Sequence, residues 1–207
     1  VEAVKKRHGT VSAVTREVLV ASEDRVEPVE PEIFLATSPW QTMSWKAELE
    51  WKRWIAEETY AKLGGLNIAL ADLAIESDGQ MYGYRNKMEF SFAEQNGETT
   101  LAFFDRGGKQ KIPVNGSVLA HHIINQSAKS ILDWIRGQSI PLRSLKSLII
   151  RSNGRQTIAG LFIKDSLTFT VYPELTGALS GFSVFYSTHQ SPASVPTAHI
   201  YQAGEEV

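Results

Sequence analysis

The stretch Gly83–Phe92, with the sequence GYRNKMEFSF, alternates apolar and polar residues over almost its whole length. This alternation is the period of a β-strand with one buried and one solvated face. The pattern places Tyr84 and Met88 on the buried face. It places Arg85 and Lys87 on the solvated face, roughly 7 Å apart along the strand. Two interpretations stay open: the solvated face lies in water, or its cations begin a site for a phosphate backbone.

A β-hairpin is predicted over residues 81–105. Asn96-Gly97 separates the opening strand from a second apolar run, TTLAFFDR. Asn-Gly between two such runs is the strongest short-range hairpin signal. Asn153-Gly154 likewise separates SLKSLIIRS from QTIAGLFIKD and predicts a second hairpin. The runs LTFTVYPE and FSVFYS, which follow, predict two further strands.

A long helix is predicted upstream of the first hairpin. It begins after Ser44, a favourable cap residue, and continues through KAELEWKRWIAEETYAKL to a stop at Gly64-Gly65. Trp51 and Trp54 lie off its main apolar side. We therefore expect the helix to pack on two sides, either with core on both or with the tryptophans as a ligand platform.

The order of the elements defines the fold class. A second helix follows Ser117, carries an apolar stripe at helical spacing and ends at Gly137. Because strands and helices do not alternate as βαβα, we predict an α+β fold with a mainly antiparallel sheet and two principal helices. The proline-punctuated EDRVEPVEPE is typical of a chain leaving a domain, and residues 188–207 have the prolines and irregular pattern of a linker.

Composition limits the class of protein. The chain has 207 residues, 43% of them hydrophobic and 21% charged, which is ordinary for one or two folded domains. It lacks an apolar run of about 18 residues, and its first residues lack the apolar core of a secretory signal. We therefore predict a cytoplasmic protein without a membrane partner. A net charge of −2 gives no global attraction for nucleic acid, so any RNA site has to rest on a local patch.

Several chemistries lack the residues that they need. The chain contains no cysteine, which excludes disulfides, iron–sulfur clusters, thiolate metal sites and cysteine nucleophiles. The glycine patterns of dinucleotide, nucleotide and hydrolase-elbow sites do not occur. His121-His122 has no third metal ligand at a suitable spacing. We predict no catalytic residues and no metal site in this chain.

The candidate binding residues gather around the first hairpin. Five cations and four carboxylates within residues 85–111 leave a local net charge of +1. From charge alone, this region is either a solvated set of cross-strand ion pairs or a weak RNA-backbone site.

The hairpin residues YRNKMEFSF, followed by LAFFDRGGKQKIPV and a helix that contains Ile-Asn, resemble the central domain of the RNA uridine-C5 methyltransferases. Upstream, SEDRVEP resembles the family's exit from an N-terminal β-barrel, and SPWQTMSWKAELEWKR resembles its linker and helix. The resemblance implies three parts: the remnant of a small, TRAM-like β-barrel domain with a linker over residues 1–32, a central RNA-recognition domain over 33–187, and a linker over 188–207 toward a Rossmann-like methyltransferase domain.

The resemblance also implies a partner and a binding site. The partner is RNA, as a tRNA or ribosomal RNA loop. The residues implied to bind it are Tyr84, Arg85, Lys87, Phe104, Arg106 and Lys109. Tyr84 has a second interpretation, because its parity predicts burial. If it is buried, it supports the sheet and only the cations contact RNA.

The sequence departs from the family at its cysteines. Many members hold an iron–sulfur cluster in the linker, but Glu30 and Ser38 stand beside or at the expected cysteine positions, so no cluster is expected. The family's S-adenosylmethionine site and cysteine nucleophile lie in a catalytic half that would begin beyond Val207. We therefore expect the RNA-binding portion of a methyltransferase, inactive alone and without a cofactor of its own, with S-adenosylmethionine expected for the full-length protein. The alternatives are a free-standing degenerate RNA- or protein-binding module, or an unrelated α+β domain.

Overall fold

The computed structural model describes residues 2–66, 75–106, 109–191 and 194–206. The chain divides into two compact units. The first combines Val1–Glu27 with Trp40–Leu73, and the second combines Pro28–Pro39 with Ala74–Val207. The long helix therefore groups with the N-terminal unit, although the sequence predicts it within the central domain.

The first unit contains a hairpin and the long helix. Strands β1 (Glu2–Arg7) and β2 (Thr10–Val14) form a two-stranded antiparallel sheet. That this hairpin is the remnant of a β-barrel stays a prediction. Helix α2 (Trp45–Gly64) confirms the predicted helix. Its Ser44 side chain accepts a hydrogen bond from the Ala47 amide at 3.3 Å, and Gly65 ends the helix with a left-handed backbone, at φ 62°.

The tryptophans of α2 do not pack as expected. Trp51 and Trp54 are 46% and 51% exposed, and Ala47 is the one buried residue of the helix. The expectation that α2 packs on two sides is therefore wrong. Both strands of the accompanying sheet are short, and β2 is itself exposed along its length.

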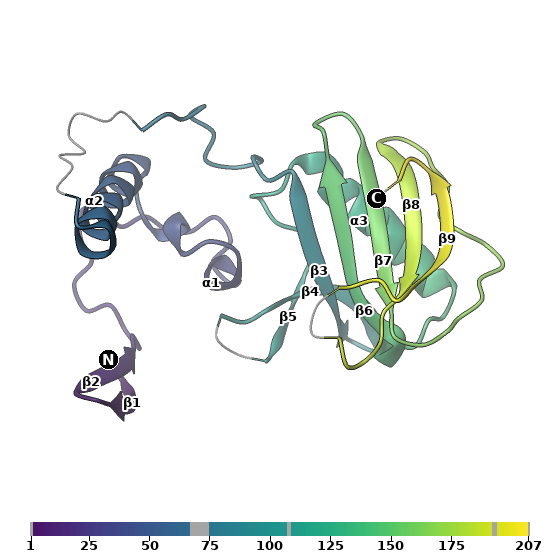
Figure 1. The fold of residues 1–207 in the computed structure, drawn as a ribbon, viewed down its shortest axis with the longest axis horizontal. Coiled ribbons are helices and arrows are strands. Elements are labelled where there is room, and N and C mark those ends of the chain that lie inside the picture. Colours follow the sequence, from purple (N-terminus) through teal and green to yellow (C-terminus); the bar gives the residue numbers. More distant parts are fainter. Residues whose placement is uncertain (1, 67–74, 107–108, 192–193, 207) are drawn as a thin grey trace. The chain divides into compact units, whose positions relative to one another are not determined.

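The second unit is built on a seven-stranded sheet (Figure 1). The strand order is β5-β4-β3-β6-β7-β8-β9, and every neighbouring pair is antiparallel except β7 with β8. The α+β class with a mostly antiparallel sheet is thereby confirmed. The strands are β3 (Lys87–Gln95), β4 (Glu98–Phe104), β5 (Lys111–Val114), β6 (Leu145–Ser152), β7 (Thr157–Ile163), β8 (Leu179–Tyr186) and β9 (Ala198–Gly204).

Both predicted hairpins form around their Asn-Gly pairs. Asn96 and Gly97, with φ of 54° and 82°, connect β3 to β4, which are the positive angles that a tight hairpin turn requires. Asn153-Gly154 connects β6 to β7. The first hairpin is shorter than predicted, because β3 starts at Lys87 and the preceding residues are irregular.

Two sequence predictions fail at the far side of the sheet. The run LTFTVYPE, residues 167–174, is irregular, although it was expected to be a strand. Its aromatic residues pack instead on Trp134, with ring centroids 5.3 Å away for Phe169 and 6.4 Å away for Tyr172. The linker prediction for residues 188–207 also fails for Ala198–Gly204, which form β9 and pair with β8.

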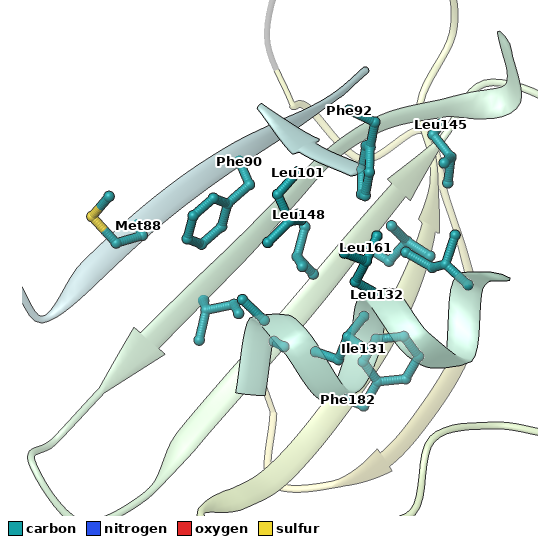
Figure 2. Packing of buried hydrophobic residues seen from close by; sticks show 14 of the residues in the cluster. Met88, Phe90, Phe92, Leu101, Ile131, Leu132, Leu145, Leu148, Leu161 and Phe182 are labelled. Carbon is teal, nitrogen blue, oxygen red and sulfur yellow. The ribbon is translucent and has the colours of Figure 1, made fainter. Parts of the chain in front are cut away.

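Helix α3 (His122–Gly137) covers one face of this sheet (Figure 1). It begins at His122 instead of directly after Ser117, and it ends at Gly137 as predicted. Its buried stripe packs against the strands, as Figure 2 shows for Ile131 and Leu132 beside Leu148 and Leu161. This layer of helix on sheet forms the hydrophobic core, which leaves the opposite face of the sheet for other contacts.

A buried carboxylate fixes the segment Pro28–Pro39 within the second unit. Glu30 accepts hydrogen bonds from the Val118 amide at 2.8 Å, the Ser117 hydroxyl at 3.2 Å and the Thr37 hydroxyl at 3.0 Å. The segment contains the short helix α1 (Phe34–Thr37). Because these bonds satisfy a carboxylate that is only 9% exposed, Glu30 is a structural residue.

The helices that the structure describes include none with the length and apolar character that crossing a lipid bilayer requires.

Candidate nucleic-acid interface

The face of the sheet opposite α3 carries the candidate site, and we call it the open face. Along β3, Met88, Phe90 and Phe92 are buried toward α3. Successive side chains of a strand point to opposite faces, so Lys87 and Ser91 belong to the open face. The alternation that predicts the strand therefore also decides which of its polar residues share a surface.

The open face contains a concave site of about 480 Å³, which we call the lysine cavity. Three lysines reach it from separate parts of the sheet: Lys111 from β5, Lys146 from the start of β6 and Lys164 from just beyond β7. Ser91 and Phe104 line it from β3 and β4. The strand order brings these residues together, although 73 positions separate Ser91 from Lys164 in the chain.

The lysines of the cavity perturb one another. Burial lowers the pKa of Lys111 below its usual value, and repulsion from the Lys164 ammonium lowers that pKa further. Burial and Lys164 lower the pKa of Lys146 in the same way. Glu89 is the one carboxylate among the lining residues. The cavity therefore concentrates positive charge, which favours an anionic ligand.

Two of the lysines are held by hydrogen bonds to the backbone. Lys146 donates to the Ser187 hydroxyl at 2.8 Å and to the Thr188 and Ser191 carbonyls at 3.3 and 3.0 Å. Lys111 donates to the Phe92 carbonyl at 2.8 Å. These bonds place the two ammonium groups on a rigid sheet, which is the pre-organisation that a binding site needs.

Phe104 adds an aromatic ring beside the lysines of the cavity. It lies at the end of β4, is 54% exposed, and has the Lys111 ammonium 5.5 Å from its ring centroid. An exposed ring beside a cation is suited to a nucleobase, because bases stack on aromatic faces while cations bind the phosphates. Phe104 is the predicted site residue that the structure places in the lysine cavity.

Lys87 lies elsewhere on the open face. It pairs in register with Arg151 of β6, and both side chains are exposed. Two like charges directly opposite each other destabilise a sheet slightly. The sequence supplied Lys87, but it did not identify Arg151 as its neighbour.

Arg85 and Tyr84 differ in exposure from what strand parity predicts. Arg85 is half-buried, and its guanidinium donates to the Thr37 carbonyl at 3.0 Å, which holds α1 in place. Tyr84 is 49% exposed, so its predicted burial is wrong. The cause is the later start of β3, because strand parity does not apply to an irregular residue. Tyr84 therefore keeps a surface that a ligand can contact.

Arg106 and Lys109 are exposed, and they flank two positions outside the described residues. Sequence reasoning missed Lys146 and Lys164 as site residues. Each lies at the edge of an apolar run, and this signal marks a strand end without revealing which strand will be its neighbour.

Comparison with known proteins gives two informative matches. No protein-family model matches the chain. An uncharacterized RNA methyltransferase of Fusobacterium nucleatum is 24% identical over 136 residues, which cover 62% of this chain and 29% of that protein. The crystal structure of Pyrococcus abyssi tRNA (uracil-54, C5)-methyltransferase in complex with S-adenosyl-L-homocysteine superposes with a TM-score of 0.68 and 13% identity. That match covers 99% of this chain and 48% of the solved one.

The class that these findings support is the RNA methyltransferases. The sequence match is to a protein named as an RNA methyltransferase. The structural match shows that the chain shares its fold with part of the Pyrococcus protein. Both relatives are RNA-modifying methyltransferases by their names, in line with the resemblance seen in the sequence. The matches span less than half the length of either relative.

Proposed function

We propose that this chain is the RNA-recognition portion of an RNA uridine-C5 methyltransferase, and that the open face of its sheet binds an RNA loop. The observation that carries the proposal is the lysine cavity, where three cations and an exposed aromatic ring meet on a rigid surface. The relatives give the substrate class, because one acts on uracil 54 of tRNA and the other is an RNA methyltransferase by name. A tRNA loop is accordingly the proposed partner.

The proposed interface extends beyond the cavity. Lys87 and Arg151 add two exposed cations on the same face, and Tyr84, Arg106 and Lys109 add exposed groups around the first hairpin. Single-stranded loops suit such a surface, since their unstacked bases are free to stack on aromatic side chains. Arg85 is not proposed as a contact, because its guanidinium is bound to the Thr37 carbonyl.

The methyl donor is proposed for the full-length protein only. Sites for such cofactors lie where a helix follows a strand at the carboxyl edge of a parallel sheet. In the described residues the one parallel pair, β7 and β8, is joined by an irregular segment without a helix. The residues present therefore do not fit an S-adenosylmethionine site.

The test is binding of an unmodified tRNA transcript, measured by fluorescence anisotropy at several salt concentrations. We expect weak binding. The logarithm of the association constant should fall linearly with the logarithm of the salt concentration, because phosphate contacts release counterions. A stem-loop that contains uridine 54 should compete with the full transcript. No binding at millimolar RNA in low salt would contradict the proposal and favour the alternative, a degenerate module that binds a protein.

A further inference from the structure

The floor of the lysine cavity contains an unpaired polar atom. Ser91 is 6% exposed, and its hydroxyl has no hydrogen-bond partner among the described residues. Buried polar groups are almost always hydrogen-bonded, so an unpaired hydroxyl that lines a cavity is a candidate contact for a ligand. A serine hydroxyl can donate to a phosphate oxygen or bond to a sugar hydroxyl.

The three lysines have different capacities to bind. Lys146 already uses its three donors on Ser187, Thr188 and Ser191, so it contributes charge alone. Lys111 donates one hydrogen bond to the Phe92 carbonyl, and two of its N–H donors stay available. Lys164 forms no ion pair within the described ranges. Lys111 and Lys164 are therefore the groups that can donate to a ligand.

The one acidic residue that lines the cavity, Glu89, is hydrogen-bonded within the chain. Glu89 accepts a hydrogen bond from the Ser194 hydroxyl at 2.9 Å, and that hydroxyl also contacts Ser147. The carboxylate is thus oriented toward the segment that follows β8. The cavity keeps a positive balance because its three lysines outnumber this one carboxylate.

The size of the cavity limits the ligand. Its volume of about 480 Å³ lies within the range of pockets that hold small organic molecules, and it exceeds what one phosphate group needs. Phe104, half exposed at its edge, provides a flat apolar surface beside the cations. A ligand that combines a phosphate with a flat ring matches both features.

We propose that the lysine cavity seats one nucleotide of the bound RNA, with its phosphate at Lys111 and Lys164, a polar oxygen at the Ser91 hydroxyl and its base against Phe104. This inference rests on the proposed function and specifies how the open face recognises single-stranded RNA. Within the cavity, Lys164 repels both Lys111 and Lys146. The bound phosphate relieves that repulsion and supplies the missing hydrogen bond.

The test uses the whole chain with uridine monophosphate, uridine and the stem-loop RNA as separate probes. Binding of the two small probes is followed by NMR chemical-shift changes, and RNA binding by anisotropy. Uridine monophosphate should bind more tightly than uridine, because the phosphate meets the lysines. Lys164→Ala should weaken monophosphate and RNA binding by about tenfold, the loss of one charge-assisted contact. Ser91→Ala is a nearly isosteric change. It should weaken the binding of uridine monophosphate and of RNA by about fivefold each.

The matched control is Lys129→Ala, which removes an exposed lysine from α3 on the opposite side of the sheet. Its affinity for each probe should stay within about twofold of the affinity of the parent chain. Thermal melting of each variant separates lost binding from lost folding.

The outcomes distinguish this inference from the proposed function. If RNA binds and both cavity variants bind it as tightly as the parent chain, the nucleotide seat is overturned and the proposed function survives. If uridine monophosphate binds in a Lys164-dependent way while RNA does not bind, RNA is overturned as the source of the nucleotide, and the proposed function fails with it. Equal affinity for uridine and its monophosphate would overturn the role of the lysines.

Discussion

At the scale of single residues, Lys87 and Arg151 show how a cost to folding can indicate a binding role. The two cations face each other across β3 and β6. Replacing both with alanine should change the free energy of unfolding by no more than about 0.5 kcal/mol, because exposed charges contribute little and the pair repels itself. The same double variant should bind RNA more weakly. The slope of log affinity against log salt should fall by about 0.7 for each cation that contacts a single strand.

This prediction is checked by urea unfolding and by anisotropy titrations in parallel, with Lys129→Ala as the control. A double variant that loses stability but keeps its RNA affinity would show that the pair serves the sheet instead of a ligand.

The lowered pKa of Lys111 leads to a second prediction at this scale. The folded state releases the Lys111 proton at a lower pH than the unfolded state, whose pKa stays near 10.5. Between these two values the unfolded state binds more protons, so this lysine makes stability rise with pH. Below the lowered pKa the charged, buried ammonium works against folding. The stability of the parent chain relative to Lys111→Met should therefore increase as the pH approaches 10.5.

Thermal unfolding of both proteins across alkaline pH measures this difference. A constant difference between the parent chain and Lys111→Met would mean that the Lys111 ammonium is not desolvated in the folded state.

At the scale of elements, the pairing of β8 with β9 depends on close backbone contact. A Cβ atom at Gly181 would lie 2.0 Å from the Glu205 carbonyl oxygen, a distance that backbone atoms cannot accommodate without moving. Gly181→Ala should therefore separate the end of β9 from β8 and lower the free energy of unfolding by about 1–3 kcal/mol, as overpacking does. Gly137→Ala is the matched control, because nothing lies within 4 Å of its added Cβ.

Urea unfolding compares the two variants, and hydrogen exchange locates the effect. We expect faster exchange of the β9 amides in Gly181→Ala than in the parent chain. Unchanged exchange together with parental stability would contradict the observed register of β9.

At the scale of the whole molecule, we predict that the chain transfers no methyl group to uridine-containing RNA when S-adenosylmethionine is supplied. Uracil C5 becomes nucleophilic only after a thiolate adds to C6, and this chain has no cysteine. The measurement is methyl incorporation from labelled cofactor, with heat-inactivated protein as the control. Incorporation at C5 in proportion to protein concentration would show a complete active site with a different nucleophile.

The elements that could be predicted depend on local chemistry. Ser44 and Gly65 bound α2 because a cap hydroxyl and a left-handed glycine act within one turn of the chain. Asn96-Gly97 forms its hairpin because the two residues tolerate the positive angles of the turn. Lys87 is a candidate because the alternation places it on the solvated face of the first strand, and Phe104 is one because the family resemblance implies it.

The predictions that failed concern segments whose structure depends on contacts with distant parts of the chain. LTFTVYPE has the composition of a strand, but its aromatic residues gain more by packing on Trp134 than a strand could offer. Residues 198–204 have no strong strand pattern, and they form β9 because β8 presents an unpaired edge. Such contacts between distant segments override weak local preferences.

The sequence by itself determined the class of fold, the two main helices, the Asn-Gly hairpins and the lack of a thiol, because each depends on residue identity or on neighbours a few positions apart. Only the tertiary structure decided that Lys111, Lys146 and Lys164 share one cavity, that Arg151 faces Lys87 and that the Arg85 guanidinium donates to the Thr37 carbonyl. The physical reason is strand order. The pairing of β3 with β6 and of β6 with β7 sets which side chains become neighbours, and periodicity along one strand carries no information about the strand beside it.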